Sequence, residues 1–200
     1  MRDYYEQRAP EYDDWWLGTG LFASRERPGW GDDVAALQET LAALPPARTL
    51  DVACGTGFLT QHLPGELTGL DQSAAMLAVA GARIPRATFV QGDALAPPFE
   101  PGAFERVHAS HFYGHLTPEQ RIAFLAVAAR LAGELVITDS ALRPECEPEA
   151  WQERKLNDGS RHRVYKRWFT ADGLAAELGG GEVLYDGPWF VALVRAGAAQ

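Results

Sequence analysis

Short apolar runs alternate with amphipathic stretches along most of the chain. The runs end at polar or glycine-rich turns, which is typical of buried strands. They predict strands at 48–53, 66–71, 87–93, 104–110 and 134–140. The amphipathic stretches predict helices at 34–44, 73–84, 118–132 and 171–179. Because strands and helices alternate, we expect a parallel sheet with right-handed crossovers.

The C-terminal part of the chain breaks this alternation. Two further predicted strands, 182–186 and 189–196, are joined only by Gly187-Pro188. That connection is too short for a crossover between parallel strands. We therefore expect the two strands to form an antiparallel hairpin at one end of the sheet.

Two segments fall outside the alternating pattern. Residues 1–30 are rich in Tyr, Trp, Arg and Asp and predict a short helix followed by an irregular arm. Segment 141–169 carries the run NDGS at 157–160 between two strand-like runs, and Asp-Gly in that setting is typical of a hairpin. We expect both segments to act as lids on a single domain that comprises residues 1–200.

Composition limits the class of protein further. A chain of 200 residues fits one domain. No apolar run reaches the roughly 18 residues that a membrane span needs, and the charged start MRDYYEQRAPEYDD shows no secretory signal. The two cysteines, Cys54 and Cys146, lie far apart and belong to no Cys/His cluster. We therefore expect a cytoplasmic protein that has no membrane partner and no bound metal.

The charge is acidic overall but uneven. With 27 acidic and 18 basic residues, the net charge is −9, which disfavours a nucleic-acid partner because such affinity depends on neutralising phosphates. Residues 154–167 nevertheless hold six cations and a single acid, Asp158. This basic segment predicts either attraction of an anionic small molecule, such as a carboxylate or phosphate, or simply a solvated hairpin face.

Glycines and acidic residues follow three consecutive predicted strands. The first strand runs through Asp51 into a turn with Gly55 and Gly57, and then into a helical stretch. Glycine lets the backbone approach a ligand where a Cβ would clash. Asp71, at the end of the second strand, is placed to accept hydrogen bonds from both ribose hydroxyls. Asp93, at the end of the third, could accept one from an adenine amine. We therefore expect a nucleotide site at this edge of the sheet.

Two common nucleotide-binding loops fit this turn poorly. A dinucleotide fingerprint needs a small residue where Thr60 stands. A phosphate-binding loop needs a lysine, and no lysine precedes residue 155. The carboxylate of Asp51 would also repel a pyrophosphate. It favours an ammonium or sulfonium group instead, directly or through water.

The motifs LDVACGTGFLT, LTGLDQSAAML and FVQGDALAPPF resemble those of class I S-adenosylmethionine-dependent methyltransferases of the small-molecule type. The resemblance covers residues 32–140 well and 168–196 moderately, although Ala53 stands where the motif usually has its first glycine. It implies an α/β, Rossmann-like, doubly wound fold, with a mostly parallel seven-stranded sheet and an antiparallel C-terminal hairpin strand. It also implies S-adenosyl-L-methionine as cofactor and S-adenosyl-L-homocysteine as product.

The resemblance further implies which residues hold the cofactor. The methionine part would lie on the glycine turn, the ribose on Asp71, and the adenine near Asp93. In many such enzymes an N-terminal arm closes over the cofactor, with a tyrosine near its carboxylate. The residues expected to bind the cofactor are Asp51, Ala53, Cys54, Gly55, Gly57, Asp71, Gln72, Met76, Asp93, Ala94, Ser110, Tyr4 and Tyr12.

The loop after the fourth strand, ASHFYGHL at 109–116, faces the departing methyl group in that family. The unperturbed pKa of a histidine suits a general base near neutral pH. We therefore expect His111, Tyr113 and His115 as candidate catalytic residues. Packing or cofactor contact is the alternative for either histidine. The spacing of the two histidines, H-x3-H, also suggests a metal site, but no third ligand is evident in the sequence.

The expected function is transfer of a methyl group from S-adenosylmethionine to an O, N or S atom of a small molecule. Two alternatives stay open: a methyltransferase that acts on tRNA or rRNA, and a catalytically silent cofactor-binding partner of another subunit. The acidic charge and the lack of an Asn/Asp-Pro-Pro-Tyr/Phe motif weigh against the RNA alternative. Neither the acceptor nor the choice between monomer and homodimer follows from the sequence.

Overall fold

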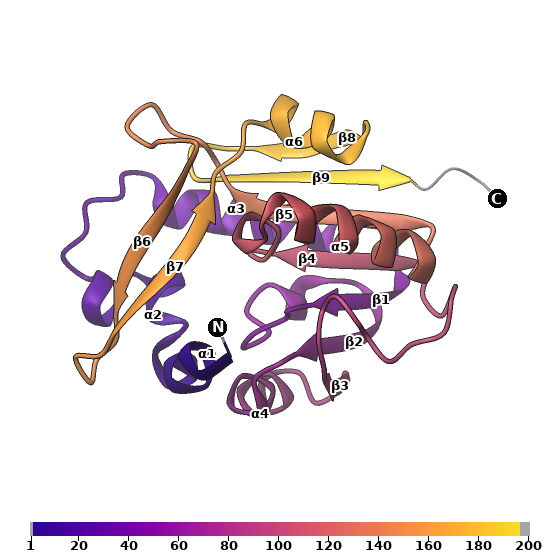
Figure 1. Ribbon diagram of the computed structural model, residues 1–200, viewed down its shortest axis with the longest axis horizontal. Helices are drawn as coiled ribbons and strands as arrows, with labels where there is room; N and C mark the ends of the chain where they lie inside the picture. The colour runs from indigo at the N-terminus through magenta and orange to yellow at the C-terminus, as the bar shows by residue number, and fades with distance from the viewer. Residues whose placement is uncertain (1, 197–200) are drawn as a thin grey trace.

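The computed structural model describes residues 2–196. Its centre is a seven-stranded sheet in the order β3-β2-β1-β4-β5-β9-β8 (Figure 1). The strands are β1 (Ala47–Val52), β2 (Gly65–Asp71), β3 (Thr88–Gln91), β4 (Arg106–Ser110), β5 (Glu134–Ser140), β8 (Glu182–Asp186) and β9 (Phe190–Ala196). Strands β1 to β5 run parallel, and β9 runs antiparallel between β5 and β8. The predicted Rossmann-like sheet with an antiparallel C-terminal hairpin is confirmed.

The strand order reverses at β1. This strand pairs with β2 on one side and with β4 on the other. The chain therefore winds outward in opposite directions from β1, and such a reversal opens a crevice at the carboxyl ends of the strands. The predicted ligand-binding side chains follow these ends of the strands.

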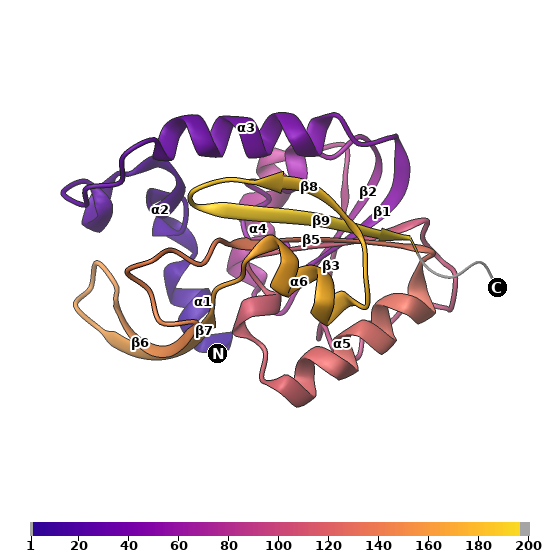
Figure 2. The same cartoon turned by 90° about the horizontal axis from the view of Figure 1, so that it is seen from above.

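Helices cover both faces of the sheet. Helix α3 (Trp30–Ala42) lies on one face, and α5 (Pro118–Leu131) and α6 (Ala171–Leu178) lie on the other, as Figure 2 shows. Helix α4 (Ala74–Arg83) packs on β2 and β3. Two apolar clusters result, one between α5, α6 and the sheet and one between α3 and the sheet.

Helix ends follow local capping chemistry. As predicted, Ser73 Oγ accepts a hydrogen bond from Met76 N at 3.1 Å, and Thr170 caps α6 in the same way. The helix expected at 34–44 was misplaced: it spans 30–42, because Gly29 adopts a φ of 72° that lets Trp30 begin the helix.

The helical stretch predicted after the glycine turn is wrong in length. Only one 3-10 turn, η3 (Thr60–His62), is present there. Leu63 is already extended, and Pro64 has no N–H with which to continue a helix. Since β2 begins at Gly65, the chain must return to the sheet at once.

The N-terminal arm begins with the expected short helix, but the part that follows forms further short helices and is packed, where an irregular segment was expected. It consists of α1 (Arg2–Arg8), η1 (Ala9–Glu11), α2 (Asp14–Leu17) and η2 (Gly20–Phe22). Trp16 is buried and stacks on Phe58, with 4.8 Å between ring centroids. Trp30 Nε1 donates to the carbonyl of Trp16 at 2.8 Å. The arm thus contributes to the apolar cluster beneath α3.

Segment 141–169 contains the predicted hairpin, separate from the main sheet. Its strands are β6 (Glu149–Lys155) and β7 (Arg161–Arg167). Exposed and less exposed side chains alternate along both strands, so that Arg154 and its cross-strand partner His162 face inward, whereas Arg163 faces outward. The ring of His162 packs on Tyr4, at 5.0 Å between centroids. In Figure 1 the hairpin lies beside α1, at the end of the sheet toward which the parallel strands point.

Two kinds of feature are absent from residues 2–196. No helix in this range has both the length and the apolar character needed to cross a membrane. Within the same range, no three His, Cys, Asp or Glu side chains are grouped so that they could hold a metal ion.

Asp33 joins α3 to the C-terminal hairpin. Its buried carboxylate accepts hydrogen bonds from Tyr185 Oη and, at 2.9 Å, from Trp189 N. The substitution Asp33→Ala leaves both donors without this partner, and we expect the free energy of unfolding to fall by about 1–3 kcal/mol. Urea denaturation measures this change. Asp32→Ala, at an exposed position of the same helical turn, is the matched control, and equal losses in the two variants would contradict the assignment.

Candidate active site

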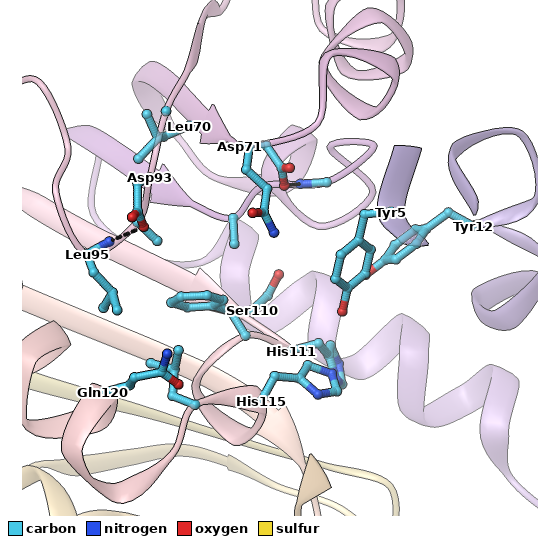
Figure 3. A pocket seen from close by; sticks show the side chains of 17 residues that line it. Tyr5, Tyr12, Leu70, Asp71, Asp93, Leu95, Ser110, His111, His115 and Gln120 are labelled. Carbon is cyan, nitrogen blue, oxygen red and sulfur yellow. Dashed lines mark hydrogen bonds between the residues drawn. The ribbon is translucent and has the colours of Figure 1, made fainter. Parts of the chain in front are cut away.

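A cavity of about 320 Å³ opens at the carboxyl ends of the central strands. Its volume lies in the range of small-molecule sites. Figure 3 shows Asp71 and Asp93 on one side of it and Tyr5 with Tyr12 on the other. The lining residues are Tyr5, Tyr12, Ala53, Gly55, Leu70, Asp71, Gln72, Gly92, Asp93, Ala94, Leu95, Ser110, His111, Phe112, His115, Leu116 and Gln120. We call this space the first cavity.

The glycine turn after β1 forms the floor of the first cavity. Ala53 and Gly55 both adopt a φ of 55°, so the turn needs the left-handed region at two positions. A Cβ on Gly55 would point at the ring of Tyr12, 3.7 Å from its nearest atom. That distance is an ordinary contact, so the positive φ, and not crowding, is what favours glycine at this position.

Asp71 joins this turn to the start of α4. Its Oδ2 accepts from Gly55 N and its Oδ1 from Ser73 N, both at 2.9 Å. Burial raises the pKa of Asp71, and these two N–H donors partly oppose the rise. Each carboxylate oxygen keeps a second lone pair. The side chain is thus fixed in orientation and can still accept hydrogen bonds from a vicinal diol.

The opposite end of the first cavity suits a flat heterocycle. Asp93 lies just beyond β3, where its Oδ1 accepts from Leu95 N at 2.9 Å. Leu70, Leu95 and Leu116 supply apolar wall. A carboxylate beside apolar surface matches a purine that carries an exocyclic amine.

Eight of the predicted cofactor residues line the first cavity and five do not. Asp51 is one of the five, because it lies beneath the glycine turn and is only 1% exposed. Its carboxylate accepts from Thr60 Oγ1 and, at 2.8 Å, from His108 Nδ1. Asp51 therefore anchors the turn from below instead of facing a ligand.

Packing explains why the other four lie elsewhere. Burial raises the pKa of the Cys54 thiol well above its usual value, and the sulfur lies under β2. Gly57 faces α4, where an added Cβ would come within 3.0 Å of an Ile84 methyl carbon. Met76 is fully buried, and Tyr4 packs against the β6–β7 hairpin.

Tyr5 is the residue of the arm that the sequence prediction missed. It lines the first cavity, whereas Tyr4, its neighbour on α1, does not. Successive helical residues point about 100° apart, so the two tyrosines cannot share a face. The helical run RDYYEQR was visible, but its rotation depends on how α1 docks.

The loop after β4 is held by the buried carboxylate of Asp139. This group accepts from Gly114 N and Ser140 N, both at 2.8 Å, and pairs with Lys166 Nζ of β7. Burial by itself would raise the pKa of Asp139, but Lys166 holds it below its usual value. One carboxylate therefore joins β5, the turn η4 (Tyr113–His115) and the hairpin.

His115 lies in this turn and lines the first cavity. Its Nδ1 is 2.6 Å from the carbonyl oxygen of Tyr165. A carbonyl can only accept, so Nδ1 carries the proton and Nε2 keeps its lone pair. Burial lowers the pKa of His115 well below its usual value, and Lys166 and Arg154 lower it further. The imidazole is therefore neutral around pH 7.

His111 also lines the first cavity, in an aromatic surrounding. Its φ of 49° is unusual for a residue with a side chain. The ring packs edge-on against Trp15 and Trp16, at 5.0 and 4.9 Å between centroids. Burial lowers the pKa of His111 to about 3. Its Nε2 is buried without a hydrogen-bond partner among residues 2–196.

Tyr113, the third predicted catalytic residue, does not reach the first cavity. It is 1% exposed and packs between Phe124 and Phe169 below the sheet. Burial raises the pKa of its phenol to about 12. The 3-10 turn directs Tyr113 toward the apolar cluster, while His115 at the end of the same turn faces the cavity.

A second cavity of about 810 Å³ adjoins the first. The two share Tyr5, Tyr12, His111 and His115. The N-terminal arm and the hairpin supply most of its wall. Its charged lining comprises Arg8, Arg25, Arg27, Arg143, Arg154, Lys155, Arg161 and Lys166, against Glu11, Glu26 and Glu153. This excess of cations contrasts with the net charge of −9 of the whole chain.

The basic segment is thus divided by strand alternation. Arg154 and Lys166 belong to the inward face, and Arg161 is ion-paired with Glu153 near the rim. Arg163 is exposed on the outer face, over the ring of Trp151 at 5.0 Å. The sequence could not separate these cations, because all six fall within one short run.

Known proteins resemble this chain in both sequence and fold. Residues 49–133 match the family model described as a methyltransferase domain. The demethylmenaquinone methyltransferase of Renibacterium salmoninarum is 31% identical over 139 residues, which cover 68% of this chain and 56% of that protein. The 2-phytyl-1,4-naphtoquinone methyltransferase of Thermosynechococcus vestitus is 44% identical over 70 residues, 30% of this chain and 31% of that protein. The chain thus spans about a third to just over half of the length of such curated relatives.

A solved structure described as a DhpI–SAH complex shares the fold more completely. It aligns with a TM-score of 0.74 and 27% identity over 98% of this chain and 95% of that chain. The fold and the site therefore define a Rossmann-like methyltransferase domain. The sequence match and the shared fold are those of class I S-adenosylmethionine-dependent methyltransferases, and the glycine turn, Asp71 and Asp93 at the first cavity suit this cofactor.

Asp71 offers a direct test of the cofactor site. The substitution Asp71→Asn replaces one carboxylate oxygen with an NH2 group. In the wild type, that oxygen accepts a hydrogen bond from a backbone N–H group and can accept another from a ribose hydroxyl. We expect the Kd for S-adenosylhomocysteine to rise roughly 10- to 100-fold, as for the loss of a charged hydrogen bond. Calorimetric titration measures it, with Glu66→Gln at the exposed start of β2 as control.

The same titration at lower pH adds a second readout. Because burial raises the pKa of Asp71, the carboxylate takes up a proton at a higher pH than an exposed aspartate does. Wild-type affinity should therefore weaken on acidification. An affinity that is insensitive both to the substitution and to acid would contradict the role of Asp71.

Proposed function

We propose that this chain transfers a methyl group from S-adenosylmethionine in the first cavity to an O, N or S atom of a small molecule in the second. The shared wall of the two cavities carries this proposal, because four aromatic side chains line both. When bound, the cofactor supplies an electrophilic methyl group on a sulfonium sulfur. The protein must then align an acceptor lone pair with that carbon and exclude water.

The proposed general base is His115. Its Nδ1–H bond to the carbonyl of Tyr165 fixes the tautomer that leaves Nε2 able to take a proton. Such a base is needed only for an acceptor whose proton must leave, such as a hydroxyl. We propose that His111 forms part of the cavity wall and does not act as a base, since aromatic rings surround it and burial lowers its pKa to about 3.

The arm is proposed to act as the lid over the cofactor. Glu6 accepts from Ala74 N and Ala75 N at 2.7 and 3.1 Å, which ties α1 to the start of α4. Asp13 accepts from Thr56 Oγ1 at 2.6 Å and pairs with Arg83. Each of these acids directly follows one of the two tyrosines that line the first cavity, so both tyrosines are held in place and the arm can exclude water from it.

The acceptor proposed for the second cavity is a small anionic molecule. The cavity is lined mainly by cations, and such a field attracts anions. The similar methyltransferases named for demethylmenaquinone and for 2-phytyl-1,4-naphtoquinone match only part of this chain. Release of S-adenosylhomocysteine with a panel of small acids would distinguish an enzyme from a silent cofactor-binding partner.

His115→Gln tests the proposed base. We expect kcat to fall about 10²- to 10⁴-fold, as for loss of a general base, with the Kd for S-adenosylhomocysteine little changed. In the wild type, the lowered pKa keeps His115 unprotonated, so activity should stay flat as the pH falls until well below 6.5. Tyr113→Phe is the control, because Tyr113 lies outside both cavities. A larger loss in Tyr113→Phe than in His115→Gln would reverse the assignment.

Asp13→Ala tests the lid. Removal of its carboxylate frees the arm from the glycine turn, and we expect the Kd for S-adenosylhomocysteine to rise about three- to tenfold through faster dissociation. Stopped-flow displacement measures the rate. Asp3→Ala alters an exposed acid of the same arm and should leave the rate unchanged. A melting temperature equal to that of the wild type separates release of the lid from unfolding.

A further inference from the structure

Arg8 is a buried cation that has no carboxylate partner among residues 2–196. Only 6% of it is exposed, and its NH1 donates to Tyr4 Oη at 2.6 Å. The other buried cations among residues 2–196 each have an acidic partner: Arg106 with Glu134, Arg121 with Glu177 and Lys166 with Asp139. A buried charge is costly unless it is paired. The missing counter-charge of Arg8 is therefore expected from outside the chain.

Arg154 approaches the same region from the hairpin. It lies on the inward face of β6, is half-buried, and forms no ion pair within the described part of the chain. Both arginines line the second cavity. Burial raises the pKa of Tyr5 and Tyr12, and Arg154 and Arg8 both oppose that rise. Tyr4, which accepts a hydrogen bond from Arg8, packs on His162, the cross-strand partner of Arg154, so the two arginines approach the same part of the second cavity.

We infer that Arg8 and Arg154 together bind the anionic group of the methyl acceptor, a carboxylate or phosphate-type oxyanion, in the second cavity. This inference rests on the proposed function and specifies how its acceptor is held. A guanidinium presents five N–H donors, and its planar fork matches such an oxyanion. Arg8 uses NH1 on Tyr4, so its other donors remain for a ligand.

The carboxylate of the cofactor is the other anion that could reach these arginines. Arg8 stacks on Tyr12, 4.9 Å from its ring centroid, and Tyr12 in turn covers Gly55. Arg8 and Arg154 nevertheless line the second cavity and not the first. We therefore assign them to the acceptor. The two anions differ in one measurable respect, since an acceptor anion binds together with the cofactor and a competing anion displaces it.

A bound anion also affects the neighbouring base. Lys166 and Arg154 both lower the pKa of His115. Negative charge placed beside Arg154 would offset part of this field. His115 would then accept a proton more readily with the acceptor in place than without it.

The test is a calorimetric titration of the protein saturated with S-adenosylhomocysteine, at constant ionic strength. Inorganic phosphate and acetate are the probes, and acetamide is the neutral counterpart of acetate. We expect saturable millimolar binding of an anion probe, weakened at least tenfold in Arg154→Gln. The matched control is Arg163→Gln, which removes a cation from the outer face of the same hairpin and should change the affinity less than twofold. Arg8→Lys supplies a second variant that keeps the buried charge but removes the fork.

Each outcome decides a different point. The inference is overturned if neither anion binds the saturated complex, if acetamide binds as well as acetate, or if Arg163→Gln and Arg154→Gln lose affinity equally. It is also overturned if phosphate displaces S-adenosylhomocysteine, because the arginines would then hold the carboxylate of the cofactor. Failure of S-adenosylhomocysteine itself to bind would instead refute the proposed function.

Discussion

The carboxylate of Asp139 is the constraint on which the second cavity and the position of His115 depend. It is fully buried, yet it carries charge, because Lys166 and two backbone N–H groups surround it. Removal of either charge would leave the other buried and unpaired. The pair therefore holds the hairpin against β5, and with it the carbonyl of Tyr165 that orients His115. The second cavity takes its shape from the same attachment.

The distribution of charge separates the two cavities by chemistry. Carboxylates follow β2 and β3 around the first cavity, where a cofactor with a diol, an amine and a sulfonium centre needs acceptors and negative charge. Cations dominate the second cavity, although the chain as a whole carries a net charge of −9. The aromatic residues between them add little charge of their own and exclude water. A methyl donor and an anionic acceptor could thus meet while each keeps an electrostatically suitable surrounding.

Much of the fold followed from local patterns. The seven strands and the main helices were predicted, because apolar periodicity and turn residues act over a few positions. The structure brings Asp71, Gln72 and Asp93 to the first cavity, since parallel strands bring their carboxyl ends to one edge. The predictions were wrong where the packing of one element against another determines the local structure. The helix expected after Gly57 is cut short by Pro64, and the arm folds into short helices that pack around Trp16.

By itself, the sequence determined the sheet, its C-terminal reversal and the acidic side of the cofactor site, because each depends on residue type at a strand end. Only the tertiary structure decided which side chains meet across long separations. It turned Tyr5 toward the first cavity and Tyr113 away from it, and it placed four of the six neighbouring cations at the second cavity but Arg163 on the outer face of the hairpin. The direction of a side chain on a short helix or an isolated hairpin depends on what that element packs against. Arg8 and Arg154 are 146 positions apart in the sequence, and no local pattern relates them.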